Sequence, residues 1–321
     1  MIVKVGIPRG LLYYDYIPLW KTFFERLGAE VIVSDATCKQ TLDHGLRVTV
    51  DDACLPIKVY FGHVMNLCGR VDYIFAPRIV SVERRSYICP KFMGLPDMLR
   101  NILTDDEAPK IIDTCIDLSK GRGLVDGVLE TGRHFTRDPI KIWWSYLKAR
   151  SELIRYRKAV LAGQLPEQAL TKKVMNHEPA ELSVAVLGHS YNVYDSYTTM
   201  NLIKKLRQNN VAVLTAEMVP EPYIERELAS LDKKELFWTL GKRILGAANY
   251  FHKAQRVDGI IHVASFGCGP DSLVGEIVTR QVRRAQDIPI MELNIDEHSG
   301  EAGILTRIEA FVDMVKWRKG L

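Results

Sequence analysis

The chain lacks several features that mark particular classes of protein. No apolar run approaches the roughly 20 residues needed to cross a bilayer, and residues 1–9 form a strand and turn rather than a secretory signal peptide. No Gly-x-x-x-x-Gly-Lys-[Ser/Thr] motif for binding nucleotide phosphates is present. The net charge is only +4 over 321 residues, which is small for a nucleic-acid binder. We therefore expect a cytoplasmic protein that spans no membrane and binds no nucleic acid.

The six cysteines include no closely spaced CxxC pair. In a reducing compartment disulfides are not expected, so these residues are buried thiols, metal ligands or catalytic groups. Cys54, Cys89 and Cys268 each precede a proline by one or two residues. Proline favours the first turn of a helix, so we predict that these three thiols lie at helix starts, where the helix dipole favours the thiolate.

The other three cysteines have a different context. Cys68 and Cys115 resemble the buried type that packs as a small apolar side chain, and Cys38 fits either class. Simple burial without a ligand remains the alternative interpretation for all six.

Short apolar strands alternate with segments whose apolar residues have helical spacing. We predict strands at residues 2–7, 29–34, 72–77 and 109–113, and helices at 16–27, 55–67 and 95–103. This order indicates an α/β fold with parallel strands covered by helices.

The same pattern returns in the second half of the chain. At an offset of 180, Ile7 corresponds to Leu187 and Val31 to Val211, and with a small shift the strand at Asp72 corresponds to one at Asp258. An internal duplication of this kind predicts two Rossmann-like lobes as pseudo-repeats, with ligands bound beyond the carboxyl ends of the strands. We assign residues 1–118 to the first lobe, with Cys54 and Cys89, and residues 181–321 to the second, with Cys268.

Residues 119–180 interrupt the repeat. Their apolar positions have helical spacing and alternate with basic side chains; the apolar residues are Ile140, Trp143, Trp144, Leu147, Ile154 and Leu161. We expect a helical insert that joins the lobes, and its basic face is either solvated or meets phosphates or an acidic partner.

Three thiolates suit two kinds of metal site. Zinc would need a fourth protein ligand, which His63 or His262 could supply, although His262 lies inside a predicted strand and reads as a core histidine. A 4Fe-4S cluster would use three thiolates and leave one iron for water, a substrate oxygen or a serine such as Ser265. The residues alone leave both metals open.

Other polar residues are candidates for the same chemistry. Lys58 follows Cys54 by one helical turn, so it either faces the same site or is solvated. Arg9 ends the first strand and either binds an anion or faces water. Glu297 and His298 belong to residues 296–303, which form either an active-site loop or a helix cap.

Taken together, several segments resemble the acyl-CoA dehydratase activase-related family. They are residues 7–9, 52–58, 62–63, 89–91, 188–189, 194–195, 265–272, 296–298 and 306–307. That family is similar to the subunits of 2-hydroxyacyl-CoA dehydratases and benzoyl-CoA reductases. The resemblance implies a 4Fe-4S cluster at the junction of the two lobes, held by the cysteines that match Cys54, Cys89 and Cys268.

The resemblance also implies candidate residues and a function. Arg9, Lys91, Gly267 and Gly269 lie in the matched segments and are candidates for contacting the cofactor, with Ser265, Lys58, Glu297 and His298 as catalytic candidates. In the dehydratases of anaerobic metabolism, an ATP-hydrolysing activator of the actin and sugar-kinase fold, which carries its own cluster, delivers one low-potential electron. That electron converts the acyl-CoA thioester to a ketyl radical.

This sequence departs from the family in ways that leave alternatives open. Dehydratase subunits are longer and work as unlike pairs, so either a homodimer or a heterodimer is possible here. A relative holds an 8Fe-9S double cubane on six cysteines, and we favour one cube because only three cysteines have the context of a helix start. A non-catalytic electron-transfer or scaffold protein and a zinc-stabilised binding module are the competing functions.

Overall fold

The structure is a computed structural model that describes residues 2–119, 123–171, 180–230, 236–253, 255–285 and 288–321. The chain forms two compact units. The first comprises Met1–Lys158 with Phe237–Thr239, and the second comprises Ala159–Leu236 with Leu240–Leu321. Of the expected insert, residues 120–122 and 172–179 lie outside the described residues.

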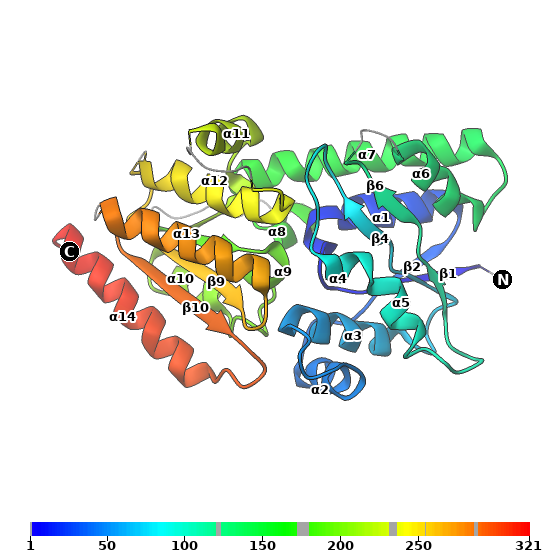
Figure 1. The fold of residues 1–321 in the computed structure, drawn as a ribbon, viewed down its shortest axis with the longest axis horizontal. Helices are drawn as coiled ribbons and strands as arrows, with labels where there is room; N and C mark the ends of the chain where they lie inside the picture. The colour runs from blue at the N-terminus through cyan, green and yellow to red at the C-terminus, as the bar shows by residue number, and fades with distance from the viewer. Residues whose placement is uncertain (1, 120–122, 172–179, 231–235, 254, 286–287) are drawn as a thin grey trace. The chain divides into compact units, whose positions relative to one another are not determined.

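The first unit is built on a parallel four-stranded sheet in the order β2-β1-β3-β5 (Figure 1). Its strands are β1 (Lys4–Ile7), β2 (Glu30–Val33), β3 (Tyr73–Phe75) and β5 (Lys110–Ile112). Val5 pairs with Val31 on one side and with Tyr73 on the other. The central strands are short apolar runs because helices cover both faces of the sheet.

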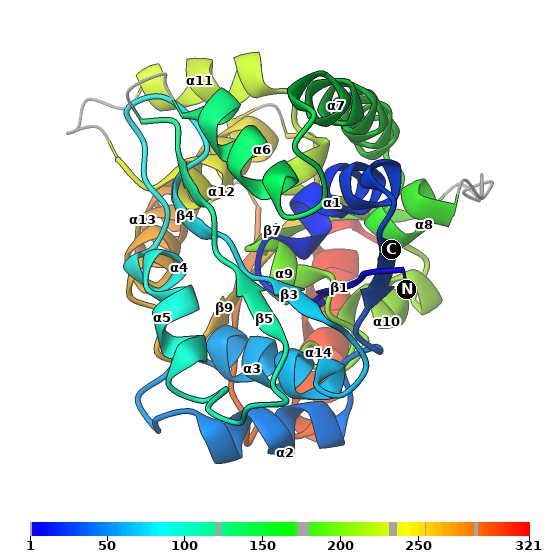
Figure 2. The same cartoon turned by 90° about the vertical axis from the view of Figure 1, so that its right-hand side faces the viewer.

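Helix α1 (Tyr13–Leu27) covers one face of this sheet, and α3 (Leu55–Leu67) covers the other, with α2 (Lys39–Val48) beyond it (Figure 2). Helices α2 and α3 touch through glycine. A Cβ atom on Gly45 would lie 1.8 Å from the Lys58 carbonyl oxygen, and one on Gly62 would lie 1.8 Å from that of Thr41. The two glycines therefore permit a backbone contact that no larger residue would allow.

The remaining elements of the first unit include a second, two-stranded parallel sheet. They are β4 (Arg78–Ser81), α4 (Pro90–Met93), α5 (Leu95–Arg100), β6 (Cys115–Asp117), α6 (Leu124–Arg133) and α7 (Pro139–Leu161), whose last residues belong to the second unit. Strands β4 and β6 form the small sheet. Neither this sheet nor helix α2 was predicted from the sequence, whereas a helix beginning at Cys89 was.

Helix α7 buries apolar residues other than the six whose helical spacing predicted it. Of those six, five are exposed: Ile140, Trp144, Leu147, Ile154 and Leu161. The buried stripe is instead Ile142, Tyr146, Ala149, Leu153, Tyr156 and Val160. The helix therefore carries two apolar stripes. The buried stripe contains the small residue Ala149, which allows close packing, and Tyr156 Oη on the same stripe donates to the Tyr14 carbonyl oxygen at 2.6 Å.

The second unit contains a parallel sheet in the order β10-β9-β7-β8. Its strands are β7 (Leu182–Gly188), β8 (Val211–Thr215), β9 (Gly259–Ser265) and β10 (Ile290–Ile295). Helices α12 (Thr239–Lys253) and α13 (Gly269–Ala285) cover one face, while α10 (Leu202–Gln208) and α14 (Glu301–Lys319) cover the other (Figure 1). Its shorter elements are α8 (Pro166–Thr171), α9 (Ser190–Val193), the 3₁₀ helix η1 (Ala216–Met218) and α11 (Glu221–Ala229).

The two units repeat one topology. Read from the other edge, the second sheet is β8-β7-β9-β10, so its strands follow the same order as β2-β1-β3-β5. The matching aspartates also play one role: Asp72 Oδ2 accepts the Lys4 N–H at 2.7 Å, and Asp258 Oδ2 accepts the Ser183 N–H at 2.7 Å. The predicted α/β class with Rossmann-like parallel sheets is confirmed. Among the described residues, no helix is long and apolar enough to cross a membrane.

Candidate functional site

Cys54 occupies the N-cap position of α3, as its following proline predicted. The residue is extended, with φ −67° and ψ 151°, and its carbonyl oxygen accepts the N–H groups of Ile57 at 3.0 Å and Lys58 at 3.3 Å. Its thiol is buried. Burial raises the pKa of Cys54, the positive charge of Lys91 opposes this rise, and Cys89 adds to it.

Cys89 occupies the N-cap position of α4 and is half-buried. Its charge contributes to raising the pKa of Cys54, after burial of that thiol. The Lys91 Nζ approaches the Asp52 carbonyl oxygen at 3.5 Å, beside the Cys54 segment. Cys54, Cys89 and Lys91 all lie in the first unit, where Lys91 and Cys89 act on the pKa of Cys54 in opposite directions.

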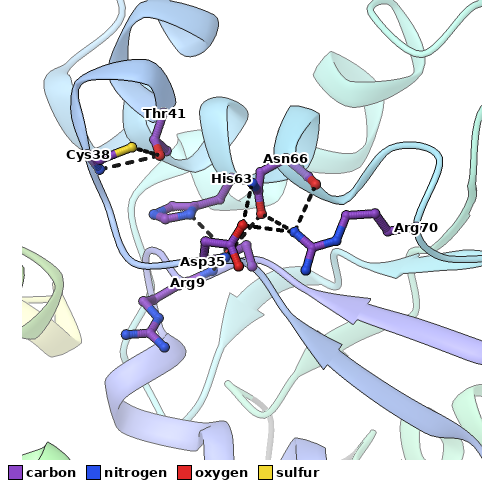
Figure 3. Close-up of polar contacts among 8 residues, drawn as sticks. Arg9, Asp35, Cys38, Thr41, His63, Asn66 and Arg70 are labelled. Carbon is purple, nitrogen blue, oxygen red and sulfur yellow. Dashed lines mark hydrogen bonds and ion pairs between the residues drawn. The ribbon is translucent and has the colours of Figure 1, made fainter.

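Lys58 and Arg9 were each expected either to face a bound group or to face solvent. The Lys58 side chain is buried, so its interpretation as a solvated lysine is wrong. Arg9 follows β1, where its backbone N–H donates to Ser34 Oγ at 2.8 Å and its guanidinium lies 5.5 Å from the Tyr13 ring centroid. Figure 3 shows this guanidinium turned away from the Asp35 carboxylate.

His63, which we considered as a zinc ligand, is committed to hydrogen bonds inside the first unit (Figure 3). Its Nδ1 lies 3.0 Å from Ser34 Oγ and its Nε2 lies 3.0 Å from Thr37 Oγ1. Burial, followed by the charge of Arg9, lowers the pKa of His63 to about 3. The ring is therefore neutral and both nitrogens are engaged, which argues against a metal at this histidine.

The other three cysteines depart from the sequence interpretation. Cys38 is the N-cap of α2, so four cysteines rather than three begin helices; its Sγ lies 3.4 Å from Thr41 Oγ1. Cys115 opens β6 and is exposed, so its assignment to the core is wrong. Cys68 follows α3, is half-buried, and donates from Sγ to the Val64 carbonyl oxygen at 3.4 Å. Strand β6 was not predicted, which explains the error at Cys115, and the N-cap position decides the open interpretation of Cys38.

Cys268 begins α13 directly after a tight turn at the end of β9. Gly267 has φ +77°, a left-handed conformation that glycine adopts at little cost. The Cys268 N–H donates to the Ser265 carbonyl oxygen at 3.1 Å, and the Ser272 N–H donates to the Cys268 carbonyl oxygen at 3.0 Å. The thiol is buried, and Gly269 is the first residue of the helix. The strand-to-helix placement of Cys268 is as predicted.

A buried group of metal-binding side chains surrounds Cys268. His189 follows β7, Asp271 lies in the first turn of α13, and one ligand atom from each of His189, Cys268 and Asp271 lies within 4.8 Å of the others. Asp271 Oδ1 is also 3.3 Å from Nε2 of His262 on β9. Burial acts to raise the pKa of Asp271, but His189 and His262 more than offset it, and the pKa lies below its ordinary value.

Sequence reasoning did not identify this group. His189 and Asp271 entered only as parts of matched segments, and His262 was interpreted as a core histidine. An available signal was the acidic residue three positions after Cys268, at the predicted helix start. The convergence with His189 depends on the pairing of β7 with β9 and has no local sequence pattern.

Ser265 and the segment after β10 have defined local contacts. The Ser265 hydroxyl is buried and donates to Asn192 Oδ1 at 2.9 Å. Asp296 Oδ1 accepts both the His298 N–H at 2.8 Å and the Ser299 hydroxyl at 3.0 Å, so the loop closes on itself. His298 is exposed and Glu297 is half-buried. The N-cap of α14 is Gly300, which has no side chain to cap the helix. The prediction that a side chain of residues 296–303 caps this helix is therefore wrong.

Two family models match the chain. The CoA enzyme activase uncharacterised domain (DUF2229) matches residues 4–219, and the 2-hydroxyglutaryl-CoA dehydratase, D-component, matches residues 189–315. None of the curated proteins compared with the chain matches it. The first match covers more than half of the chain, and together the two agree with the family expected from the sequence segments. The chain therefore belongs to the CoA enzyme activase domain family, and its second half is similar to the D-component of 2-hydroxyglutaryl-CoA dehydratase.

Proposed function

We propose that the chain is the iron-sulfur component of a 2-hydroxyacyl-CoA dehydratase-type enzyme. In this proposal Cys54, Cys89 and Cys268 hold a 4Fe-4S cluster. An ATP-hydrolysing activator of the actin and sugar-kinase fold supplies one low-potential electron. The proposed substrate class is the acyl-CoA thioesters, which agrees with the CoA-related descriptions of both matching families.

The observation that supports the proposal most directly is the placement of both Cys54 and Cys89 at helix starts in the first unit. Each thiol is the N-cap of a helix, and each comes from a separate segment of the first unit. Two thiols that influence each other electrostatically, with a lysine nearby, form a donor set suited to an anionic metal cluster.

The residues around these cysteines fit the charge of such a group. The N-terminal N–H groups of α3 and the ammonium group of Lys91 would stabilise thiolates, because both place positive charge beside the sulfur atoms. A bound cluster would supply one-electron chemistry at a potential set by its charge and hydrogen bonds. We further propose Arg9, Gly267 and Gly269 as cofactor contacts.

The catalytic candidates remain Ser265, Lys58, Glu297 and His298. The Ser265 hydroxyl donates to Asn192, and its oxygen lone pairs could still bind an iron. Ser265, water and a substrate oxygen are therefore all candidates for the fourth ligand of the cluster.

Iron and sulfide analysis of the anaerobically purified protein tests this proposal. We expect about four irons per chain. Single replacements of Cys54, Cys89 or Cys268 by serine should remove the cluster. Cys115→Ser is the matched control, because this thiol is exposed and should leave the iron content unchanged.

Two results would contradict the proposal in different ways. Loss of iron from both Cys68→Ser and Cys115→Ser, with the fold intact, would favour the 8Fe-9S double cubane. A full cluster in a protein that binds no acyl-CoA would favour the electron-transfer or scaffold function.

A further inference from the structure

Asp271 is a buried carboxylate with two histidines beside it, His189 Nε2 at 3.9 Å and His262 Nε2 at 3.3 Å from its Oδ1. Its side chain is 0% exposed, and neither carboxylate oxygen has a hydrogen-bond partner among the described residues. His262 Nε2 approaches Oδ1 at 3.3 Å without the alignment of a hydrogen bond. Ionised carboxylates are costly to bury unless they are paired or coordinate a metal, so this position favours a cation.

The neighbouring donors lie close enough together for small side-chain movements to bring them around one ion. The ligand atoms of His189, Cys268 and Asp271 lie within 4.8 Å of one another, and all three residues are buried. Around a tetrahedral ion with bonds of 2.0–2.3 Å, donor atoms are roughly 3.3–3.7 Å apart. His189 Nε2 and Asp271 Oδ1 are 3.9 Å apart, close to this spacing and too long for a hydrogen bond. His189 and Asp271 are therefore placed as two ligands of one ion would be, and not as a direct hydrogen-bonded pair.

We propose that His189, Cys268 and Asp271 bind a single divalent transition-metal ion of the zinc class, with the fourth position open. A thiolate, an imidazole and a carboxylate are the donor types that such ions take. His262 supports the site from outside, because its Nε2 faces the Asp271 carboxylate. Its ring packs on Gly275, where a Cβ atom would lie 2.5 Å from the His262 Cε1.

This inference does not depend on Cys54 or Cys89. It shares only Cys268 with the proposed cluster, so we expect the two occupants to exclude each other. The single ion then belongs to the cluster-free protein, and the two proposals can fail separately.

Titration of the cluster-free, full-length protein with Co²⁺ tests the site, because a cobalt-bound thiolate gives a charge-transfer absorption band. We expect one equivalent of Co²⁺ to bind with this band, both in the natural sequence and in the Cys54→Ser/Cys89→Ser double variant. Cys268→Ser should abolish the band. Asp271→Asn should weaken binding at least about tenfold, and His262→Gln by about 10–100-fold.

The proposal is overturned if the folded protein shows no thiolate band, or if Cys268→Ser or Asp271→Asn leaves Co²⁺ binding unchanged. Should Asp271→Asn fail to fold, Zn²⁺ must still raise the Tm of the natural protein and not that of Cys268→Ser. Iron and sulfide analysis of the natural protein separates the two proposals. Cobalt binding in a protein that never acquires a cluster would refute only the proposed function, and a cluster without the cobalt band would refute only the single-ion site.

Discussion

Cys38 and Cys115 are both exposed thiols, but their surroundings shift their pKa values in opposite directions. A hydrogen bond with the Thr41 hydroxyl lowers the pKa of Cys38. Partial burial and then the negative charge of Asp117 raise that of Cys115. Because the thiolate is the reacting form, we expect iodoacetamide at neutral pH to modify Cys38 first. Peptide mass spectrometry would measure both rates; Thr41→Val should slow Cys38 alone, and equal rates at the two thiols would contradict the prediction.

His63 should make the stability of the protein depend on pH. Its pKa is about 3 in the folded state, against about 6.5 in an unfolded chain, so folding favours the neutral ring. Its contribution is therefore fully present above the unfolded pKa and is lost as the pH falls from about 6.5 towards 3, by up to about 1.4 kcal/mol per pH unit.

Urea unfolding over this pH range would measure the effect of His63. The His63→Gln variant should have a flatter dependence of unfolding free energy on pH than the natural sequence. His298→Gln is the control, because His298 is exposed and its replacement should leave the slope unchanged. If the unfolding free energy of His63→Gln depends on pH as steeply as that of the natural sequence, groups other than His63 cause the loss of stability in acid.

The sequence predicted the individual thiols better than the group around Asp271. Proline after Cys54, Cys89 and Cys268 is a local signal, and the structure places each of these residues at a helix start. The contact of Asp271 with His189 joins segments more than 80 residues apart in sequence, and only the sheet brings them together. Local sequence patterns therefore identify where a residue lies in its helix or strand. Which side chains from distant segments meet in space depends on the tertiary fold.

At the scale of elements, α7 offers a direct test of which helix face is buried. Leu153 is 7% exposed and its neighbour Ile154 is 43% exposed. Leu153→Ala should cost about 2–5 kcal/mol of unfolding free energy, because it removes packed methyl groups and leaves a cavity. Ile154→Ala should change it by no more than about 0.5 kcal/mol. Denaturant unfolding of the two variants measures these values. A larger loss of unfolding free energy in Ile154→Ala than in Leu153→Ala would contradict the burial of the Leu153 face.

Strong apolar patterns and helix-start signals explain which elements the sequence predicted. Helix α3 has the predicted bounds because an apolar segment follows Cys54 and Pro56. Helix α2 was missed because it buries only Thr41, Leu42 and Gly45, and its place depends on the glycine contact with α3. Strands β4 and β6 are only three or four residues long, too short for a clear alternating pattern.

At the scale of the whole molecule, the repeated topology was predictable because each unit keeps its strand order and a hydrogen bond from a backbone N–H to the matching aspartate. The side chains of the two units have diverged within that frame. The first unit presents a thiol pair, Cys54 and Cys89, whereas the second presents a mixed group of His189, Cys268 and Asp271. Two units of one topology thus carry different side chains of the types that can bind metals.

The proposed electron delivery should require a second protein and ATP. These 321 residues contain no Gly-x-x-x-x-Gly-Lys-[Ser/Thr] motif, so we do not expect the chain to couple nucleotide hydrolysis to electron transfer by that route. A thioester accepts an electron only at very low potential, and the energy for that step must then come from the activator. The measurement follows the paramagnetic signal of the cluster in cluster-loaded protein mixed with a chemical reductant, the candidate activator and ATP. We expect rapid reduction only in the complete mixture and none with a non-hydrolysable ATP analogue. Equally fast reduction without activator or ATP would show that ordinary reductants reach the cluster unaided, and the proposed division of labour between the two proteins would then be wrong.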